Sequence, residues 1–175
     1  LRLGIVAGEP SGDALGARVV TALNARLDGD LVVEGIGGPA LQAAGCRSLF
    51  PMRELAVMGL TEPLRRLPRL LRIRSALRQH FTAHPPHVFL GVDSPDFNLT
   101  LERQLRETGV PVAHRVSPSI WAWRSGRVKS IERSVDHMLH LFPFESAAYA
   151  GSGVPLEYVG HPLADDLPLA SASES

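Results

Sequence analysis

The run of residues 91–98, Gly-Val-Asp-Ser-Pro-Asp-Phe-Asn, carries the groups best suited to chemistry in this chain. Asp93 directly follows apolar residues that are typical of a buried strand. In an open parallel sheet, ligands bind in the crevice beyond the carboxyl ends of the strands. Asp93 would therefore present a carboxylate at the mouth of a cleft, where it could act as a general base. The alternative is that Asp93 and Asp96 only form a turn and cap the next helix.

Local turn signals predict how this segment continues. Pro95 should keep Ser94 extended and prevent the helix from starting early. The helix is then expected to begin at Phe97, with Asp96 as its N-cap residue. Asn98 adds an amide to the two carboxylates at this strand end.

A second polar turn, residues 8–13 (Gly-Glu-Pro-Ser-Gly-Asp), lies between the first predicted strand and the first predicted helix. Gly8 and Gly12 permit a tight turn and close approach of a ligand to the backbone. Free amides at a helix start favour an anion or sugar hydroxyls, and Ser11 or Asp13 could cap that helix. The turn is not a Walker phosphate-binding loop, because no lysine follows the second glycine. It is not a nucleophile elbow either, because the serine falls one place late for the G-x-S-x-G pattern. A capped turn without a ligand is the alternative.

Other strand ends carry weaker signals. Residues 35–39 are glycine-rich but lack the spacing of a dinucleotide fingerprint. Residues 116–124 hold two tryptophans, which could stack on a sugar, contact acyl chains or simply anchor the loop to the core. His80 and His84 are four residues apart, but no third ligand follows at a useful spacing, so we predict no metal site.

Residues 64–78 combine a leucine stripe with six arginines and contain no acidic residue. A basic amphipathic helix of this kind can lie on an anionic membrane surface. The alternative is an ordinary solvated helix face. Nucleic-acid binding is disfavoured because the remainder of the chain is not basic and the formal net charge is zero. The candidate membrane contacts are Arg65, Arg66, Arg69 and Arg72.

The composition is that of an ordinary globular protein, with 45% hydrophobic and 21% charged residues among 175. The single cysteine, Cys46, excludes an internal disulfide framework and suits a reducing compartment. No apolar run reaches the length of a membrane span, and no signal peptide is recognisable. Both chain ends are expected to be the edges of a piece of something longer.

Strand-like runs alternate with helical patterns along the whole chain. This alternation predicts an α/β fold with a doubly wound, Rossmann-like parallel sheet covered on both faces. We expect one domain over residues 1–167 and a tail or linker over residues 168–175. Strands are expected at 3–7, 31–36, 47–50, 87–92, 112–116, 137–142 and 156–159, and helices at 12–26, 39–44, 62–82 (interrupted by Pro68), 97–108, 126–133 and 144–150.

Seven segments occur in an order that resembles the lipid-A-disaccharide synthase family of bacterial glycosyltransferases. The resemblance extends to about residue 167. It implies the N-terminal half of a GT-B fold, in which two Rossmann-like domains face each other across a cleft. The segments are 9–13, 37–39, 55–59, 93–98, 116–123, 142–145 and 160–162.

The resemblance implies an inverting reaction without a cofactor or metal. UDP-2,3-diacylglucosamine would be the donor, 2,3-diacylglucosamine 1-phosphate the acceptor, and the β-1,6-linked lipid A disaccharide the product. Asp93 would be the general base that takes the proton of the acceptor 6-hydroxyl. The residues implied to bind substrate are Glu9, Ser11, Gly12, Asp13, Asn98, Ser117 and Trp121.

The resemblance also implies a cytoplasmic protein that binds peripherally to the inner face of the bacterial inner membrane. The family has a C-terminal domain that supplies most UDP contacts, and this chain stops where that domain should begin. We therefore expect the chain to be inactive alone. The chain has Arg115 at a position where many members of the family carry an aromatic residue. The alternatives are a non-catalytic module that binds lipids or sugar phosphates, and a UDP-sugar enzyme such as an epimerase.

Overall fold

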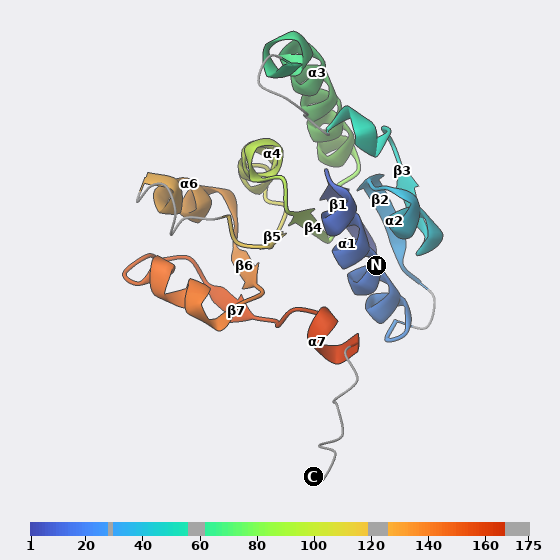
Figure 1. Ribbon diagram of the computed structural model, residues 1–175. Coiled ribbons are helices and arrows are strands. Elements are labelled where there is room, and N and C mark those ends of the chain that lie inside the picture. The colour runs from blue at the N-terminus through green and yellow to red at the C-terminus, as the bar shows by residue number, and fades with distance from the viewer. Residues whose placement is uncertain (28–29, 56–61, 119–125, 167–175) are drawn as a thin grey trace.

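The computed structural model describes residues 1–27, 30–55, 62–118 and 126–166. Seven parallel strands form one sheet in the order β3-β2-β1-β4-β5-β6-β7, which confirms the predicted α/β, Rossmann-like architecture (Figure 1). From β1 the chain adds β2 and β3 toward one edge of the sheet, and from β4 it adds β5, β6 and β7 toward the other edge. The direction of strand addition therefore reverses between the neighbouring strands β1 and β4. The strands are β1 (Arg2–Ala7), β2 (Val32–Ile36), β3 (Cys46–Ser48), β4 (Val88–Val92), β5 (Val112–Arg115), β6 (His137–His140) and β7 (Leu156–Tyr158).

Helices cover both faces of the sheet. Figure 1 shows α1 and α2 on one face and α3, α4 and α6 on the other. Short helical turns, η1 and η2, and the four-residue α7 complete the described elements. The bounds are α1 (Pro10–Asn24), α2 (Pro39–Ala43), η1 (Met52–Glu54), α3 (Glu62–Ala83), α4 (Pro95–Arg106), α6 (Gly126–Ser134), η2 (Pro143–Tyr149) and α7 (Leu163–Asp166).

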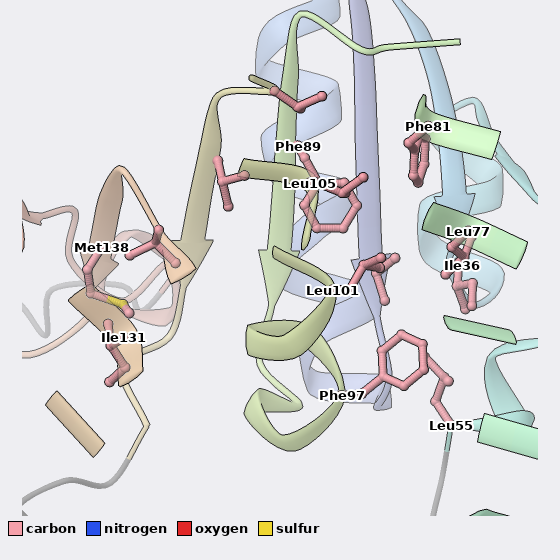
Figure 2. Close-up of a cluster of buried hydrophobic side chains, with 14 of the residues drawn as sticks. Ile36, Leu55, Leu77, Phe81, Phe89, Phe97, Leu101, Leu105, Ile131 and Met138 are labelled. Carbon is pink, nitrogen blue, oxygen red and sulfur yellow. The ribbon is translucent and has the colours of Figure 1, made fainter. Parts of the chain in front are cut away.

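The core is split into two layers by the sheet. Successive strand residues point to opposite faces, so Phe89 packs toward α3 and α4 while Leu90 packs toward α1. The layer under α3, α4 and α6 includes Phe81 and Leu101, both essentially inaccessible to solvent (Figure 2). Burial on both faces explains why β1 and β4 are nearly continuous apolar runs.

Four predictions about the turn before α4, its N-cap and the interruption of α3 are wrong. Helix α4 begins at Pro95, not Phe97, because proline suits the first helical position, where no N–H partner is required. Ser94 adopts the left-handed conformation (φ 45°, ψ 54°) and is not extended. It takes the N-cap place predicted for Asp96, which lies in the first turn. Pro68 does not interrupt α3, because the packing of later turns maintains the helix.

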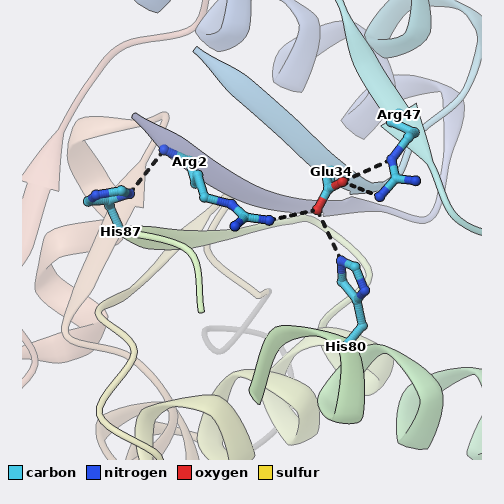
Figure 3. Close-up of polar contacts among 5 residues, drawn as sticks. All are labelled: Arg2, Glu34, Arg47, His80 and His87. Atoms are coloured by element: carbon cyan, nitrogen blue, oxygen red, sulfur yellow. Dashed lines mark hydrogen bonds and ion pairs between the residues drawn. The ribbon is translucent and has the colours of Figure 1, made fainter. Parts of the chain in front are cut away.

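The carboxylate of Glu34 fixes the helix α3 to the sheet. It accepts hydrogen bonds from Arg47 of β3 and lies 3.0 Å from His80 Nε2 of α3, with Arg2 of β1 at 3.5 Å (Figure 3). Burial alone would raise the pKa of the Glu34 carboxyl, but the hydrogen bonds from His80 and Arg47 outweigh it and hold the pKa below its ordinary value. The ionised form of the Glu34 side chain is therefore more strongly favoured in the folded chain than in the unfolded chain.

Candidate functional site

Asp93 occupies the first position beyond β4, in the middle of the sheet. Its N–H donates to the carbonyl of Arg115 at 2.9 Å, which continues the pairing of β4 with β5. Asp93 and Ser94 both have positive φ, 54° and 45°, a conformation uncommon for residues other than glycine. The Asp93 carboxylate accepts the Ser94 N–H at 2.8 Å. This tight, strained turn leaves the side chain of Asp93 half-buried and bounding a hollow.

Asn98 stabilises this turn through hydrogen bonds of its side chain to the backbone. Its side chain is fully buried, and its Nδ2 donates to the carbonyl of Asp93 at 2.8 Å and to that of Val6 at 3.2 Å. The amide therefore joins the ends of β1 and β4. The Asn98 side chain is not exposed to solvent in this structure, so it contributes to the shape of the turn through these hydrogen bonds.

The glycine turn packs directly against the Asp93 turn. A Cβ atom added at Gly12 would lie 3.2 Å from the carbonyl oxygen of Val92, and one at Gly8 would lie 2.2 Å from Ser94 Oγ. A side chain at Gly8 would thus force Ser94 to move, and one at Gly12 would crowd the end of β4, so both glycines favour the close approach of the two loops. Glu9 and Ser11 are exposed in the same turn, and Glu9 lines the hollow together with Asp93.

The hollow next to Asp93 has a volume of about 480 Å³ and an amphipathic lining. Three carboxylate residues, Glu9, Asp93 and Asp96, belong to its lining. The apolar lining comes from Leu55, Leu67, Leu70, Pro95 and Phe97. A hollow of this kind can take a ligand that joins a polar ring to hydrocarbon.

Sequence reasoning missed Arg74 as a member of this site. Its guanidinium lies 5.9 Å from the ring centre of Phe97 and lines the hollow. Partial burial lowers the pKa of Arg74. The available signal was its spacing, since Arg74 falls on the same helix face as Leu67, Leu70 and Leu77, within the apolar stripe.

Asp13 has a structural role that the sequence did not predict. Its buried carboxylate accepts the N–H groups of Gly38 (2.7 Å), Ala40 (2.9 Å) and Leu41 (3.1 Å) at the start of α2. Helix α1 instead has Glu9 at its N-cap position without a side-chain cap, so the prediction that Ser11 or Asp13 caps α1 is wrong. The reason is that Asp13 lies in the helix and points toward a neighbouring helix start.

Ser117 connects the segment after β5 to η2 through its hydroxyl group. It is buried, its hydroxyl lies 2.8 Å from the Tyr149 hydroxyl, and it donates to the carbonyl of Pro118 at 3.2 Å. Burial raises the pKa of Tyr149 to about 12. The structure thus gives Ser117 a partner in η2. Trp121, predicted to bind substrate, lies outside the described residues.

The arginines predicted to contact a membrane differ in their surroundings. Arg69 forms an ion pair with Glu54, whereas Arg72 is exposed on α3. The side chains of Arg65 and Arg66 lie outside the described part of the chain. Leu67 and Leu71 expose 47% and 45% of their surface on the same helix. Among the described helices, none is long and apolar enough to cross a membrane.

Acidic, histidine and cysteine side chains do not gather into a metal site in the described ranges, where no group of three or more could hold an ion. The polar side chains that line the hollow are the three carboxylates, the Ser94 hydroxyl and the Arg74 guanidinium.

Comparison with known proteins identifies the family. The family model described as Lipid-A-disaccharide synthetase matches residues 3–175. The lipid-A-disaccharide synthase of Saccharophagus degradans is 58% identical over 168 residues, covering 96% of this chain and 43% of the relative. The enzymes of the same name from Alkalilimnicola ehrlichii and Vibrio cholerae are each 54% identical, covering 97% and 98% of this chain and 44% and 45% of the relatives. The chain thus spans less than half the length of these relatives and corresponds to their N-terminal part. It belongs to the lipid-A-disaccharide synthetase family.

Proposed function

We propose that this chain forms the acceptor side of a glycosyltransferase that makes the lipid A disaccharide. The donor is UDP-2,3-diacylglucosamine and the acceptor is 2,3-diacylglucosamine 1-phosphate. The acceptor 6-hydroxyl oxygen attacks the anomeric carbon of the donor, the bond from that carbon to UDP breaks, and UDP leaves. Asp93 takes the hydroxyl proton. The half-buried carboxylate of Asp93 beside the amphipathic hollow is the observation that carries this proposal.

The surroundings of Asp93 support its role as the base. Its backbone is fixed by the Arg115 carbonyl and by Asn98, so the carboxylate is held in place before substrate arrives. The apolar lining residues suit acyl chains, and the polar lining residues suit a sugar ring. Glu9 and Arg74 offer further polar contacts to the acceptor.

Residues 1–167 constitute the acceptor-side domain in this proposal, and residues 168–175 lead toward a second domain. The second domain supplies the donor site across the cleft, as expected for a GT-B enzyme. Inversion at the anomeric carbon requires the base and the leaving group on opposite sides of that carbon. The chain alone should therefore bind the acceptor without turning it over.

The test is a chimera in which this chain replaces the matching N-terminal part of the Saccharophagus degradans relative, to which it is 58% identical. Disaccharide formation is measured with radiolabelled donor and unlabelled acceptor. Asp93→Asn should lower turnover by about 10²–10⁴-fold, the usual contribution of a positioned base. Asp96→Asn, a neighbouring carboxylate on the same hollow, is the matched control and should retain most activity. Undiminished turnover in Asp93→Asn would exclude Asp93 as the base.

We further propose that α3 contacts the cytoplasmic surface of the inner membrane, where the acylated substrates reside. The exposed Leu67 and Leu71 would enter the interface, while Arg72 meets anionic headgroups. Binding of the chain to phosphatidylglycerol vesicles in co-sedimentation should weaken as salt rises. Leu71→Ser should reduce binding, whereas Arg103→Gln on α4 is the control. Equal binding to phosphatidylcholine vesicles at all salt concentrations would contradict the arginine contact.

A further inference from the structure

Arg115 is a buried cation that has no counter-ion among the described residues. Its side chain points to the α1 face of the sheet, opposite to His114, and only 9% of the residue is exposed. Within the described parts of the chain, its Nε is inaccessible to solvent and has no hydrogen-bond partner, and no ion pair involves its guanidinium. A buried charge that is not paired is costly, and proteins generally satisfy such groups with an opposite charge or hydrogen bonds.

The Arg115 side chain lines a groove of about 660 Å³ between α1 and the segment after β7. Arg18 of α1 lines the same groove, and Thr21 adds a hydroxyl. No acidic residue is among the described residues that form its walls. Burial lowers the pKa of Arg115, and the nearby positive charge of Arg18 lowers it further. The other walls are mostly apolar, formed by Ala17, Val19, Ala22, Leu23, Ala25, Val159 and Pro162.

We propose that this groove binds a phosphate monoester, with Arg115 as its principal contact and Arg18 as the second cation. A phosphate dianion matches two guanidinium groups better than a carboxylate does, and arginine binds phosphate oxygens in a bidentate manner. Arg115 is itself largely withdrawn from water, which strengthens its attraction for an anion. The phosphate could be free or carried on a sugar, and the two sources share the chemistry that Arg115 recognises.

This groove is separate from the Asp93 hollow. The two share no lining residue, and they lie on opposite faces of the sheet. Arg115 is connected to Asp93 only through the backbone, where its carbonyl accepts the Asp93 N–H. The phosphate proposal therefore does not depend on the reaction proposed above, and either can fail without the other.

The test follows the Nε–H signal of Arg115 by NMR in the ¹⁵N-labelled chain, at neutral pH and constant ionic strength. Inorganic phosphate and N-acetylglucosamine 1-phosphate are titrated in parallel, with N-acetylglucosamine as the control that lacks phosphate. Both phosphates should shift the Arg115 signal in a saturable manner, and the neutral sugar should not. Tighter binding of N-acetylglucosamine 1-phosphate would show that the groove recognises a phosphate on a sugar. Equal affinity for both ligands would show that it recognises only the phosphate group.

Variants decide whether the arginines form the site. Arg115→Gln should weaken phosphate binding at least tenfold, which is the ordinary loss for a hydrogen bond to a charged group. Arg18→Gln, at an exposed position where folding is not at risk, should also weaken it. Arg103→Gln, an exposed arginine on the opposite face, should leave affinity unchanged.

Three results would overturn the proposal. They are the absence of a saturable Arg115 shift, phosphate affinity in Arg18→Gln and Arg115→Gln within twofold of the parent, and acetate binding as tightly as phosphate. The last result would indicate that the groove is built for an acidic protein segment. If Arg115→Gln does not fold, the Arg115 signal in the parent chain and the Arg18→Gln affinity still decide the matter.

Discussion

Removal of His114 should destabilise the fold far more than removal of both His114 and its partner. His114 of β5 and Glu102 of α4 are each 0% exposed, and His114 Nδ1 lies 2.6 Å from Glu102 Oε1. Gly91 of β4 makes room for the pair, since a Cβ atom there would lie 1.8 Å from Glu102 Oε1. Burial raises the pKa of Glu102, and the charge and hydrogen bond of His114 oppose that shift only in part.

His114→Leu leaves a fully buried carboxyl without its partner. Breaking a buried pair in this way costs about 3–5 kcal/mol. That is a large share of the ~5–15 kcal/mol stability of a typical domain. For a chain of this size, it corresponds to a fall in Tm of about 6–20 °C. The double variant Glu102→Met/His114→Leu removes both polar groups and should recover most of the loss, because similar volume is retained without an unpaired carboxyl.

The measurement is urea unfolding at pH 7, followed by circular dichroism, for the parent, both single variants and the double variant. The pH dependence gives an independent check. A folded-state pKa above the unfolded value means that stability is lost as pH rises through the folded pKa, so His114→Leu should regain stability on acidification. The reasoning would be refuted if the free energy of unfolding of His114→Leu fell by no more than about 0.5 kcal/mol, which is an ordinary surface effect. It would also be refuted if the double variant were no more stable than that single variant.

Two further predictions concern the polar contacts that organise the fold. Because the pKa of Glu34 is held below its ordinary value of 4.5, its contribution to stability is present above that pH and is lost as pH falls through the lower folded value. Glu34→Gln should therefore flatten the acid limb of a plot of unfolding free energy against pH, and an unchanged acid limb would contradict the role of the His80 and Arg47 contacts. Asp13→Ala should cost about 1–3 kcal/mol, because it leaves the first N–H groups of α2 without acceptors; Ser11→Ala, in the same turn, is the control, and equal losses in chemical denaturation would argue against capping by Asp13.

The sequence alone determined the architecture and the place of Asp93. Alternating apolar runs and helical patterns require a parallel sheet with crossover helices, because each run must bury both of its faces. The apolar run ending at Val92 placed Asp93 at a strand end in the middle of the sheet, and the structure agrees. These signals are local, since they depend on periodicity and neighbouring residue types within a few positions.

Only the tertiary structure decided which polar groups meet. Asp13 caps a helix that begins some 25 residues later, and Glu102 pairs with a histidine on another element. Arg74 joins the Asp93 hollow, whereas Arg115 is buried facing a groove on the opposite face. No local pattern encodes these partners, because each depends on how the crossovers bring distant elements together. The sequence could thus place a carboxylate at the sheet edge, but packing determined its neighbours. Packing also buried Arg115 where the described part of the chain offers it no counter-ion.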